Sequence, residues 1–316
     1  MKFNLNLAEL KAKLSILREH FTLEYRLQRR FDQLDGKLDL LLESLVDIHN
    51  IKPAKGRSRL RQEIGLQILR IVRDIANKHS LKYWLDFGTL LGAVRHQGFV
   101  PWDDDVDIAM ERSDYVKMCD VLKSGCLPAP LVFSDLAIPD FDMDPIIHIY
   151  EPESKCFVDI FPYDRVEKAL LSSGEITKWE EEYQKVFERI ACERLLSARN
   201  IDCLVKSGND WKREHRSGDG DLEGIAVGLE YLGANRIYRN VFNVNMLFPL
   251  KLVMFEGLEF LAPCCYDEYL RKIYGDFLRF PSDAGWSKHG QFDCDHLTDQ
   301  RLQIVLRKLE SVHISG

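Results

Sequence analysis

One short segment of the chain combines dense negative charge with the periodicity of a strand. Four carboxylates occur within positions 103–107, and the chain then passes directly into the apolar residues 108–110. Successive side chains on a strand point to opposite faces, so Asp105 and Asp107 are expected to share one face. Two carboxylates held side by side repel each other unless a cation lies between them. The segment therefore predicts a strand that presents oxygen ligands to a hard ion such as Mg²⁺ or Mn²⁺.

A second feature lies upstream of the acidic segment. Gly88 and Thr89 follow the apolar run 83–87. A glycine and a small hydroxyl residue between a strand and a helix expose backbone N–H groups, to which a phosphate can bind. Such a turn followed by a carboxylate pair resembles the nucleotidyltransferase superfamily of the polymerase-β type, in which metal ions assist attack on a phosphoryl centre. The alternative for the acidic segment is a solvated turn after Pro101.

A longer match makes the resemblance specific. Residues 86–96 read DFGTLLGAVRH and residues 98–107 read GFVPWDDDVD. These phrases closely resemble the LicD family, which includes bacterial phosphocholine transferases and is related to the fukutin-related sugar-phosphate transferases. The FEG phrase at 255–257 and the YDEYL…YGD run at 266–276 are similar to that family too.

The resemblance implies an α+β fold, with a mixed sheet of the nucleotidyltransferase type and helices around it. It also implies Mg²⁺-dependent transfer of phosphocholine or a phospho-alditol from a CDP-linked donor to a sugar hydroxyl of a cell-surface glycan, with release of CMP. Two alternatives stay open. The same metal site could place an NMP on an acceptor, or the domain could be an inactive transferase-like scaffold.

Three carboxylates are the predicted metal-binding and catalytic residues, namely Asp105, Asp107 and Asp159. Asp159 stands alone in the apolar run 156–161. Because a buried unpaired carboxylate is costly, it needs a partner. In the polymerase-β type of enzyme a later strand supplies a third acid, which binds metal or takes the proton of the nucleophile. The alternative is a salt bridge with a neighbour such as Arg165.

The remaining site residues are expected to bind substrate. Gly88 and Thr89 would hold phosphate oxygens, and Arg95 would offset charge on the leaving CMP, since a guanidinium matches phosphate oxygens bidentately. His96 could reach a phosphate, or it could be a cation stabilised by the C-terminal end of its helix. Asp104 is expected to tune the site from behind the metal ligands.

The chain divides into three parts by composition. Residues 1–50 carry apolar side chains at spacings of three and four, which predicts helices that pair in a coiled coil and make the protein a homo-oligomer. Packing of these helices on the chain's own enzyme domain, or on a membrane surface, is the alternative. Residues 51–57 contain Pro and Gly and are expected to be a linker. Residues 58–316 would form the transferase domain.

Elements within that domain follow from periodicity and capping. The expected elements are helices at 59–79, 89–94 and 113–123, strands at 82–87, 146–150 and 156–161, a mostly helical stretch at 222–246, and a hairpin at 255–260 followed by a helix from Tyr266.

Bulk properties bear on partners and compartment. The net charge of −7 gives no general basic field to hold nucleic acid. No apolar run approaches the length of a membrane span, and the N-terminus does not resemble a signal peptide. Eight cysteines without a Cys-x-x-Cys pair indicate free thiols in a reducing cytosol. Peripheral binding at the inner membrane face is the alternative location. The metal-capable residues at 289–296 fit no zinc spacing and are expected to form a surface loop.

Overall fold

The computed structural model describes residues 51–136, 146–166, 222–228, 240–279 and 297–314. Apart from Ile51, Leu278 and Arg279, these residues belong to one compact unit, residues 52–277 and 285–316. The predictions for residues 1–50 and 289–296 lie outside the described residues.

The first described helix, α2, spans Gly56–Lys78. Its buried stripe includes Ile64, Ile68 and Ile75, which lie four and seven residues apart, as an amphipathic helix requires. This stripe packs against β5 of the central sheet and against the C-terminal helix α9, Asp299–Glu310. The predicted helix is confirmed, but it begins at Gly56, so the extended part of the expected linker is shorter.

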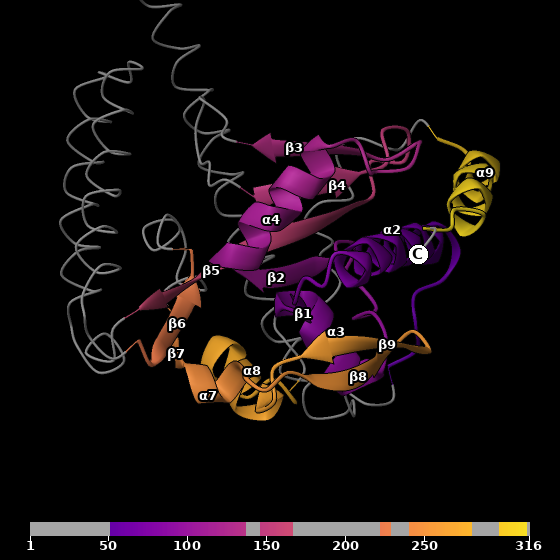
Figure 1. The fold of residues 1–316 in the computed structure, drawn as a ribbon. Helices are drawn as coiled ribbons and strands as arrows, with labels where there is room; N and C mark the ends of the chain where they lie inside the picture. Colours follow the sequence, from indigo (N-terminus) through magenta and orange to yellow (C-terminus); the bar gives the residue numbers. More distant parts are fainter. Residues whose placement is uncertain (1–50, 137–145, 167–221, 229–239, 280–296, 315–316) are drawn as a thin grey trace, which may run out of the picture. The chain divides into compact units, whose positions relative to one another are not determined.

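A mixed sheet forms the centre of the unit (Figure 1). Its strands are β1 Trp84–Leu85, β2 Asp107–Glu111, β3 Val132–Leu136, β4 Ile146–Tyr150, β5 Phe157–Val166, β6 Gly224–Val227 and β7 Val241–Asn243. The order is β1-β2-β5-β4-β3, with β6 pairing β5 and β7 pairing β6. Only the β2–β5 pair is parallel within this described sheet. Together with the helices, this sheet confirms the α+β class.

Two short helices flank the strand that carries the acidic segment. Helix α3 spans Phe87–His96, between β1 and β2, and packs against β2. Helix α4 spans Arg112–Lys123 and packs on β2 and β5. The helix expected at 113–123 is confirmed and begins one residue earlier, at Arg112. Strand β2 continues to Glu111, which pairs with Tyr163 and passes directly into the helix.

The expectation of a mostly helical stretch at 222–246 is wrong for its described parts, which form β6, β7 and the short helix α7, Val244–Leu247. All four residues of β6 are buried. A fully buried strand lacks the alternation of a half-exposed one, so periodicity cannot separate it from a buried helix.

The C-terminal elements close the unit. Strands β8 Lys251–Phe255 and β9 Leu258–Ala262 form the predicted hairpin, and α8 spans Tyr266–Tyr274. The hairpin turn places both Glu256 and Gly257 at positive φ, as a two-residue turn that follows the twist of the strands requires. Figure 1 shows α3 beside this hairpin and α8.

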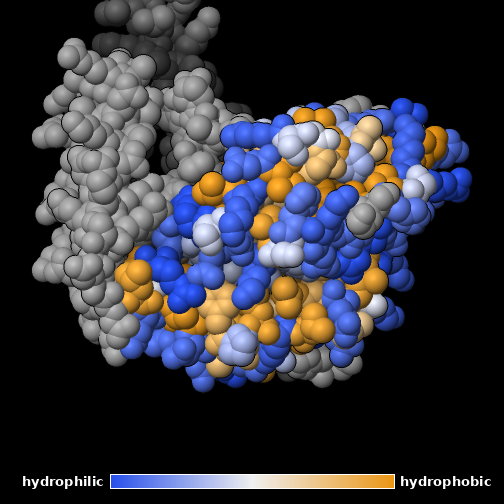
Figure 2. Space-filling view, viewed as in Figure 1, coloured by the Kyte–Doolittle hydropathy of each residue, from blue (hydrophilic) through white to orange (hydrophobic). Residues whose placement is uncertain are grey.

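The surface of the described part is polar over much of the face seen in Figure 2, with apolar residues in smaller groups between the polar ones. None of the described helices has the length and apolar character needed to cross a membrane.

Candidate active site

The strand register brings two of the predicted carboxylates together. In the parallel β2–β5 pair, Asp107 stands directly opposite Asp159. The backbone N–H of Asp159 donates to the carbonyl oxygen of Val106 at 2.8 Å, which fixes this register. On the other side of β5, His148 of β4 is the antiparallel partner of Asp159. The three residues therefore form one row across the sheet, which we call the acidic row.

Asp105 lies two residues before Asp107 in the sequence. Both Asp105 and Asp107 are partly buried, whereas Val106 and Ile108 are buried, so the predicted alternation is confirmed. Burial raises the pKa of Asp107 well above its usual range, and the negative charges of Asp105 and Asp159 raise it further. The three predicted carboxylates thus act on one another in a single neighbourhood that favours a cation.

The partner of Asp159 is a histidine that the sequence reasoning missed. His148 Nδ1 lies 2.6 Å from Asp159 Oδ1. The expected alternative, a salt bridge to Arg165, is wrong, because Arg165 pairs with Glu111 at 2.6 Å. A polar residue at the centre of the apolar run 146–150 was the available signal, since an isolated histidine on a strand needs a partner.

The turn before α3 holds the acidic strand from two sides. The Thr89 hydroxyl accepts a hydrogen bond from the backbone N–H of Asp107 at 2.8 Å, and the N–H of Asp86 donates to the Asp107 carbonyl at 3.1 Å. Thr89 is only 2% exposed, so a phosphate contact from this residue would come from its backbone N–H. A Cβ on Gly88 would lie 2.4 Å from Asp103 Oδ2, so the Asp103 carboxylate would have to turn aside to admit a side chain there.

A fully buried carboxylate, Asp86, joins this turn to two distant elements. It caps α3 by accepting from the N–H of Phe87 at 2.9 Å. It also accepts from the hydroxyls of Tyr163 in β5, at 2.7 Å, and of Tyr269 in α8, at 2.6 Å. Burial raises the pKa of Asp86 to about 6, against the opposing effect of these hydrogen bonds. The sequence reasoning also missed Asp86, although an Asp directly before a helix is a known capping signal.

The backbone of this turn is strained at one residue. Phe87 adopts a φ of 38°, which bulky side chains rarely take. Its ring packs edge-on against Phe161 at 5.0 Å between centroids, and its N–H is held by the Asp86 carboxylate. Surrounding contacts therefore maintain an entry into α3 that would otherwise be unfavourable.

The hydrogen bonds of Arg95 and His96 go mainly to other protein atoms. Arg95 is 6% exposed; its Nη1 donates to the carbonyl of Phe277 at 2.9 Å and its Nε to His96 Nε2 at 2.9 Å. Burial lowers the pKa of Arg95 to about 10. Among the described residues, Nη2 of Arg95 finds no hydrogen-bond acceptor. This nitrogen is the part of the side chain left for a ligand.

Asp104 contacts helix α2. Its carboxylate lies 3.7 Å from Nη2 of Arg61 in α2, and both side chains are largely buried. Arg61 in turn donates to the carbonyl of Ser154 at 3.2 Å. These contacts fix the position of the Asp104 loop, and the expected role of Asp104 behind the metal ligands stays a prediction.

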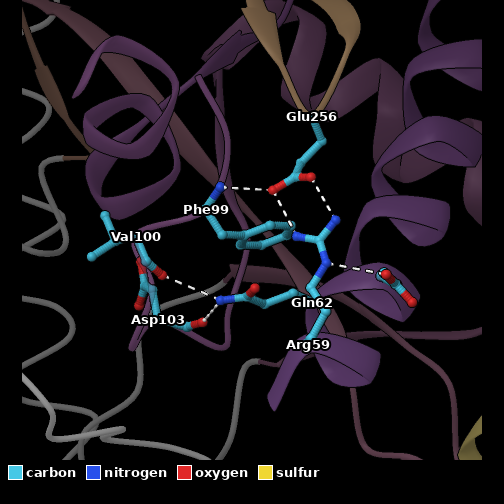
Figure 3. Close-up of polar contacts among 7 residues, drawn as sticks. Arg59, Gln62, Phe99, Val100, Asp103 and Glu256 are labelled. Atoms are coloured by element: carbon cyan, nitrogen blue, oxygen red, sulfur yellow. Dashed lines mark hydrogen bonds and ion pairs between the residues drawn. The ribbon is translucent and has the colours of Figure 1, made fainter. Parts of the chain in front are cut away.

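Distant residues hold the loop between α3 and β2, residues 97–106, which we call the acidic loop (Figure 3). Glu256, in the turn of the β8–β9 hairpin, accepts two hydrogen bonds from Arg59 at 2.9 and 2.7 Å and one from the N–H of Phe99 at 3.1 Å. Its own N–H donates to the Gln97 carbonyl at 2.9 Å. A side chain on Gly98 would collide with Glu256, at 2.5 Å from Oε1.

Helix α2 supplies a second hold on the acidic loop. The side-chain amide of Gln62 donates to the carbonyls of Val100 at 3.2 Å and Asp103 at 2.8 Å (Figure 3). The FEG phrase therefore has a structural purpose that sequence reasoning did not supply: its glutamate anchors the segment that leads into the carboxylates.

The donor set fits a hard cation that also binds substrate. Across the described residues, no group of three or more His, Cys, Asp or Glu side chains is arranged to hold a metal ion by itself. Mg²⁺ is usually held by one or two carboxylates together with phosphate oxygens and waters. Asp105 and Asp107 provide two carboxylates. The repulsion among these two and Asp159 favours the binding of a cation.

These features define a mixed α+β protein with an acidic site beside the N-terminus of a helix. Residues 80–199 match the model of a family described as LicD/FKTN/FKRP, nucleotidyltransferase domain. This match agrees with the resemblance to the LicD family over the matched residues. The acidic row lies inside the matched region, whereas α2, the β8–β9 hairpin and α8 lie outside it.

Individual relatives show the same similarity. The chain is 24% identical over 271 residues to the lipopolysaccharide cholinephosphotransferase LicD of Haemophilus influenzae, a match that covers 73% of this chain and 95% of the relative. It is 41% identical over 56 residues to the ribitol 5-phosphate transferase FKRP of Homo sapiens, covering 18% of this chain and 11% of that protein. An uncharacterized protein of Rickettsia typhi is 39% identical over 69 residues, which is 21% of this chain and 22% of the relative.

Proposed function

We propose that this protein transfers a substituted phosphate, either phosphocholine or a phospho-alditol, from a CDP-linked donor to a sugar hydroxyl of a cell-surface glycan and releases CMP. Two relatives named as cholinephosphotransferase and ribitol 5-phosphate transferase support a transferase. The observation that carries the proposal is the side-by-side placement of Asp107 and Asp159, with Asp105 close by and the N-terminus of α3 alongside.

Asp105 and Asp107 would hold Mg²⁺, or Mn²⁺, together with oxygens of the donor. When bound, the ion neutralises charge on the diphosphate and polarises the phosphorus centre. Backbone N–H groups at the start of α3 would bind a phosphate oxygen near Gly88. The Asp103 carboxylate lies over Gly88 in this structure, so it must turn aside or share the cation when a phosphate approaches.

Asp159 would draw the proton from the attacking sugar hydroxyl. A general base must point at the proton it accepts, and the 2.6 Å contact with His148 Nδ1 fixes the orientation of this carboxylate. The same residue can also contribute to the metal site, because it stands opposite Asp107.

The decisive experiment incubates the protein with Mg²⁺, a panel of CDP-choline, CDP-ribitol and CDP-glycerol, and glycan acceptors, followed by mass spectrometry of all products. Release of CMP with a gain of phosphocholine or phospho-alditol on the acceptor is the expected result. Transfer of an NMP with release of pyrophosphate from a nucleoside triphosphate would replace the proposal with nucleotidylation. Absence of metal-dependent turnover with every donor would favour a scaffold.

The proposed assembly and location need separate tests. Pairing through residues 1–50 predicts that their deletion lowers the mass measured by light scattering, and an unaltered mass would reject it. Peripheral attachment at the inner face of the membrane predicts that the protein sediments with membranes and is released by high salt.

A further inference from the structure

The C-terminal end of α8 is fixed beside the site by two contacts. Tyr269 in the middle of the helix donates to Asp86 at 2.6 Å. The carbonyl of Phe277, three residues beyond the helix, accepts from Arg95 of α3 at 2.9 Å. Tyr274, the last residue of α8, lies between these two anchors. Its position relative to the start of α3 is therefore set by buried hydrogen bonds on both sides.

The surroundings of Tyr274 differ from those of the other tyrosines that face this region. The hydroxyls of Tyr163 and Tyr269 both bond to Asp86 and lie 2.6 Å from each other. Tyr274 is partly exposed, and within the described residues its hydroxyl makes no hydrogen bond. Its hydroxyl is therefore available to a ligand or to water.

Charge indicates which kind of ligand this hydroxyl would meet. Burial raises the pKa of Tyr274 well above its usual range, and the negative charges of Asp107, Asp103, Asp86 and Asp105 raise it further. A tyrosine hydroxyl with an ordinary pKa near 10 already carries its proton at neutral pH, so toward an anion it can only donate.

A second donor without an acceptor lies in the same neighbourhood. Nη2 of Arg95 is buried and makes no hydrogen bond to a described residue. The charge of Arg95 interacts with both Tyr274 and Asp103. An unsatisfied buried donor is costly, and an oxygen of a ligand or a water would satisfy it. Two donors beside the carboxylates proposed to hold Mg²⁺ match the oxygens of a diphosphate.

We propose that Tyr274 is a further substrate-contacting residue, whose hydroxyl donates a hydrogen bond to a diphosphate oxygen of the nucleotide-linked donor while Arg95 lies alongside. This assignment rests on the proposed function. It gives the YGD part of the C-terminal run a role in the site, next to the structural role of Tyr269.

The test compares Tyr274→Phe with Tyr266→Phe. Tyr266 belongs to the same helix, but its ring contacts Lys251, with Nζ 3.7 Å from the centroid. Two readouts are needed: kcat and KM for the donor that the wild-type protein uses, and the affinity for pyrophosphate with Mg²⁺ by calorimetry. Tyr274→Phe should lower kcat/KM about 10-fold to 100-fold and weaken pyrophosphate binding about 10-fold. Unfolding curves should show that both variants stay folded.

The outcomes separate this inference from the proposed function. If the wild-type protein releases CMP but Tyr274→Phe matches Tyr266→Phe in both readouts, Tyr274 has no role and the function stands. If no CDP-linked donor is used but pyrophosphate binding is lost in Tyr274→Phe alone, the function fails and the diphosphate site stands. If the wild-type protein does not bind pyrophosphate with Mg²⁺, the diphosphate site is refuted.

Discussion

The acidic row and the C-terminal elements contribute different interactions to the same site: the row brings like charges together, and the C-terminal elements form an ion pair and hydrogen bonds. In the row, Asp107 and Asp159 stand opposite each other, and each adds to the repulsion between like charges. In the C-terminal elements, Glu256 meets the guanidinium of Arg59, and Tyr269 donates to Asp86. The chemistry and the rigidity of the site therefore come from different parts of the chain.

This difference has an energetic meaning. A site that concentrates like charges is destabilised until a cation or substrate arrives, so the fold needs favourable contacts elsewhere to hold it. Removing a charge from the acidic row should therefore abolish activity and stabilise the fold, whereas removing a C-terminal contact should weaken both.

Asp107→Asn is expected to produce the largest effect. Loss of a carboxylate proposed to hold the metal should lower kcat/KM by about 1,000-fold or more, roughly 4 kcal/mol of transition-state stabilisation. The same change removes the repulsion from Asp105 and Asp159, so the free energy of unfolding without divalent cations should rise at pH 7. CMP release and denaturant unfolding measure the two effects.

Asp120→Asn is the matched control, because Asp120 is exposed on α4. It should change neither quantity. Unaltered turnover in Asp107→Asn would remove this residue from the mechanism, and a lower stability would show that the row is not under electrostatic repulsion.

Asp86 links the two regions, and its titration should be visible in the pH dependence of stability. The folded pKa of about 6 is above the unfolded value near 3.9. A raised carboxylate pKa stabilises the fold fully below about pH 4, and that contribution is lost as the pH rises through about 6. The shift corresponds to a loss of about 3 kcal/mol between pH 4 and pH 7.

Asp86→Asn should lack this loss. The difference in unfolding free energy between the variant and the wild-type protein should therefore change in favour of the variant by about 3 kcal/mol from pH 4 to pH 7. Urea unfolding at several pH values measures it. A difference that stays constant with pH would mean that Asp86 titrates with an ordinary pKa.

Glu256→Gln tests the C-terminal hold on the acidic loop. The amide oxygen can still accept from the N–H of Phe99, but the charge that pairs with Arg59 is lost. We expect a loss of about 2 kcal/mol in stability and about 10-fold in kcat/KM, because the loop that leads to the carboxylates loosens. Glu259→Gln, on the same hairpin but exposed, is the control. Equal effects of the two variants would exclude a specific role for Glu256.

Local pattern was enough to foresee much of the acidic row. The alternation around Asp107 predicted its exposed and buried faces, and an acid isolated in an apolar run singled out Asp159. Helix α2 and the hairpin turn at Glu256 also followed from periodicity and from the glycine after it. These features depend on neighbours within a few residues, which a sequence displays directly.

The rest depends on contacts between distant residues. Nothing near Glu256 in the sequence shows that Arg59, 197 positions earlier, is its partner. The bonds of Tyr269 to Asp86 and of Asp159 to His148 likewise arise only when the sheet and α8 assemble. Strand β6 was taken for helix because burial on both sides removes the alternation that identifies a strand.

Two glycines of α3 give the test with the smallest expected effects. Gly92 lies against backbone atoms, and Gly88 lies against a side-chain carboxylate. A Cβ on Gly92 would lie 2.4 Å from the backbone oxygen of Gly98 and 3.0 Å from the N of Val100. A Cβ on Gly88 would meet only the carboxylate of Asp103, a side chain that can turn.

Gly92→Ala should therefore destabilise the fold by about 1 kcal/mol, because an overpacking cost of about 2 kcal/mol is partly offset by the higher helix propensity of alanine. Gly88→Ala should leave the unfolding free energy nearly unchanged but raise the KM for the donor, since the displaced Asp103 carboxylate and the new methyl group obstruct the approach of a phosphate to the start of α3. Unfolding curves and donor kinetics for both variants decide the matter. If Gly88→Ala were the more destabilising change, the Asp103 carboxylate would be rigidly held, and the start of α3 would belong to the supporting structure rather than to the part of the site that adjusts to substrate.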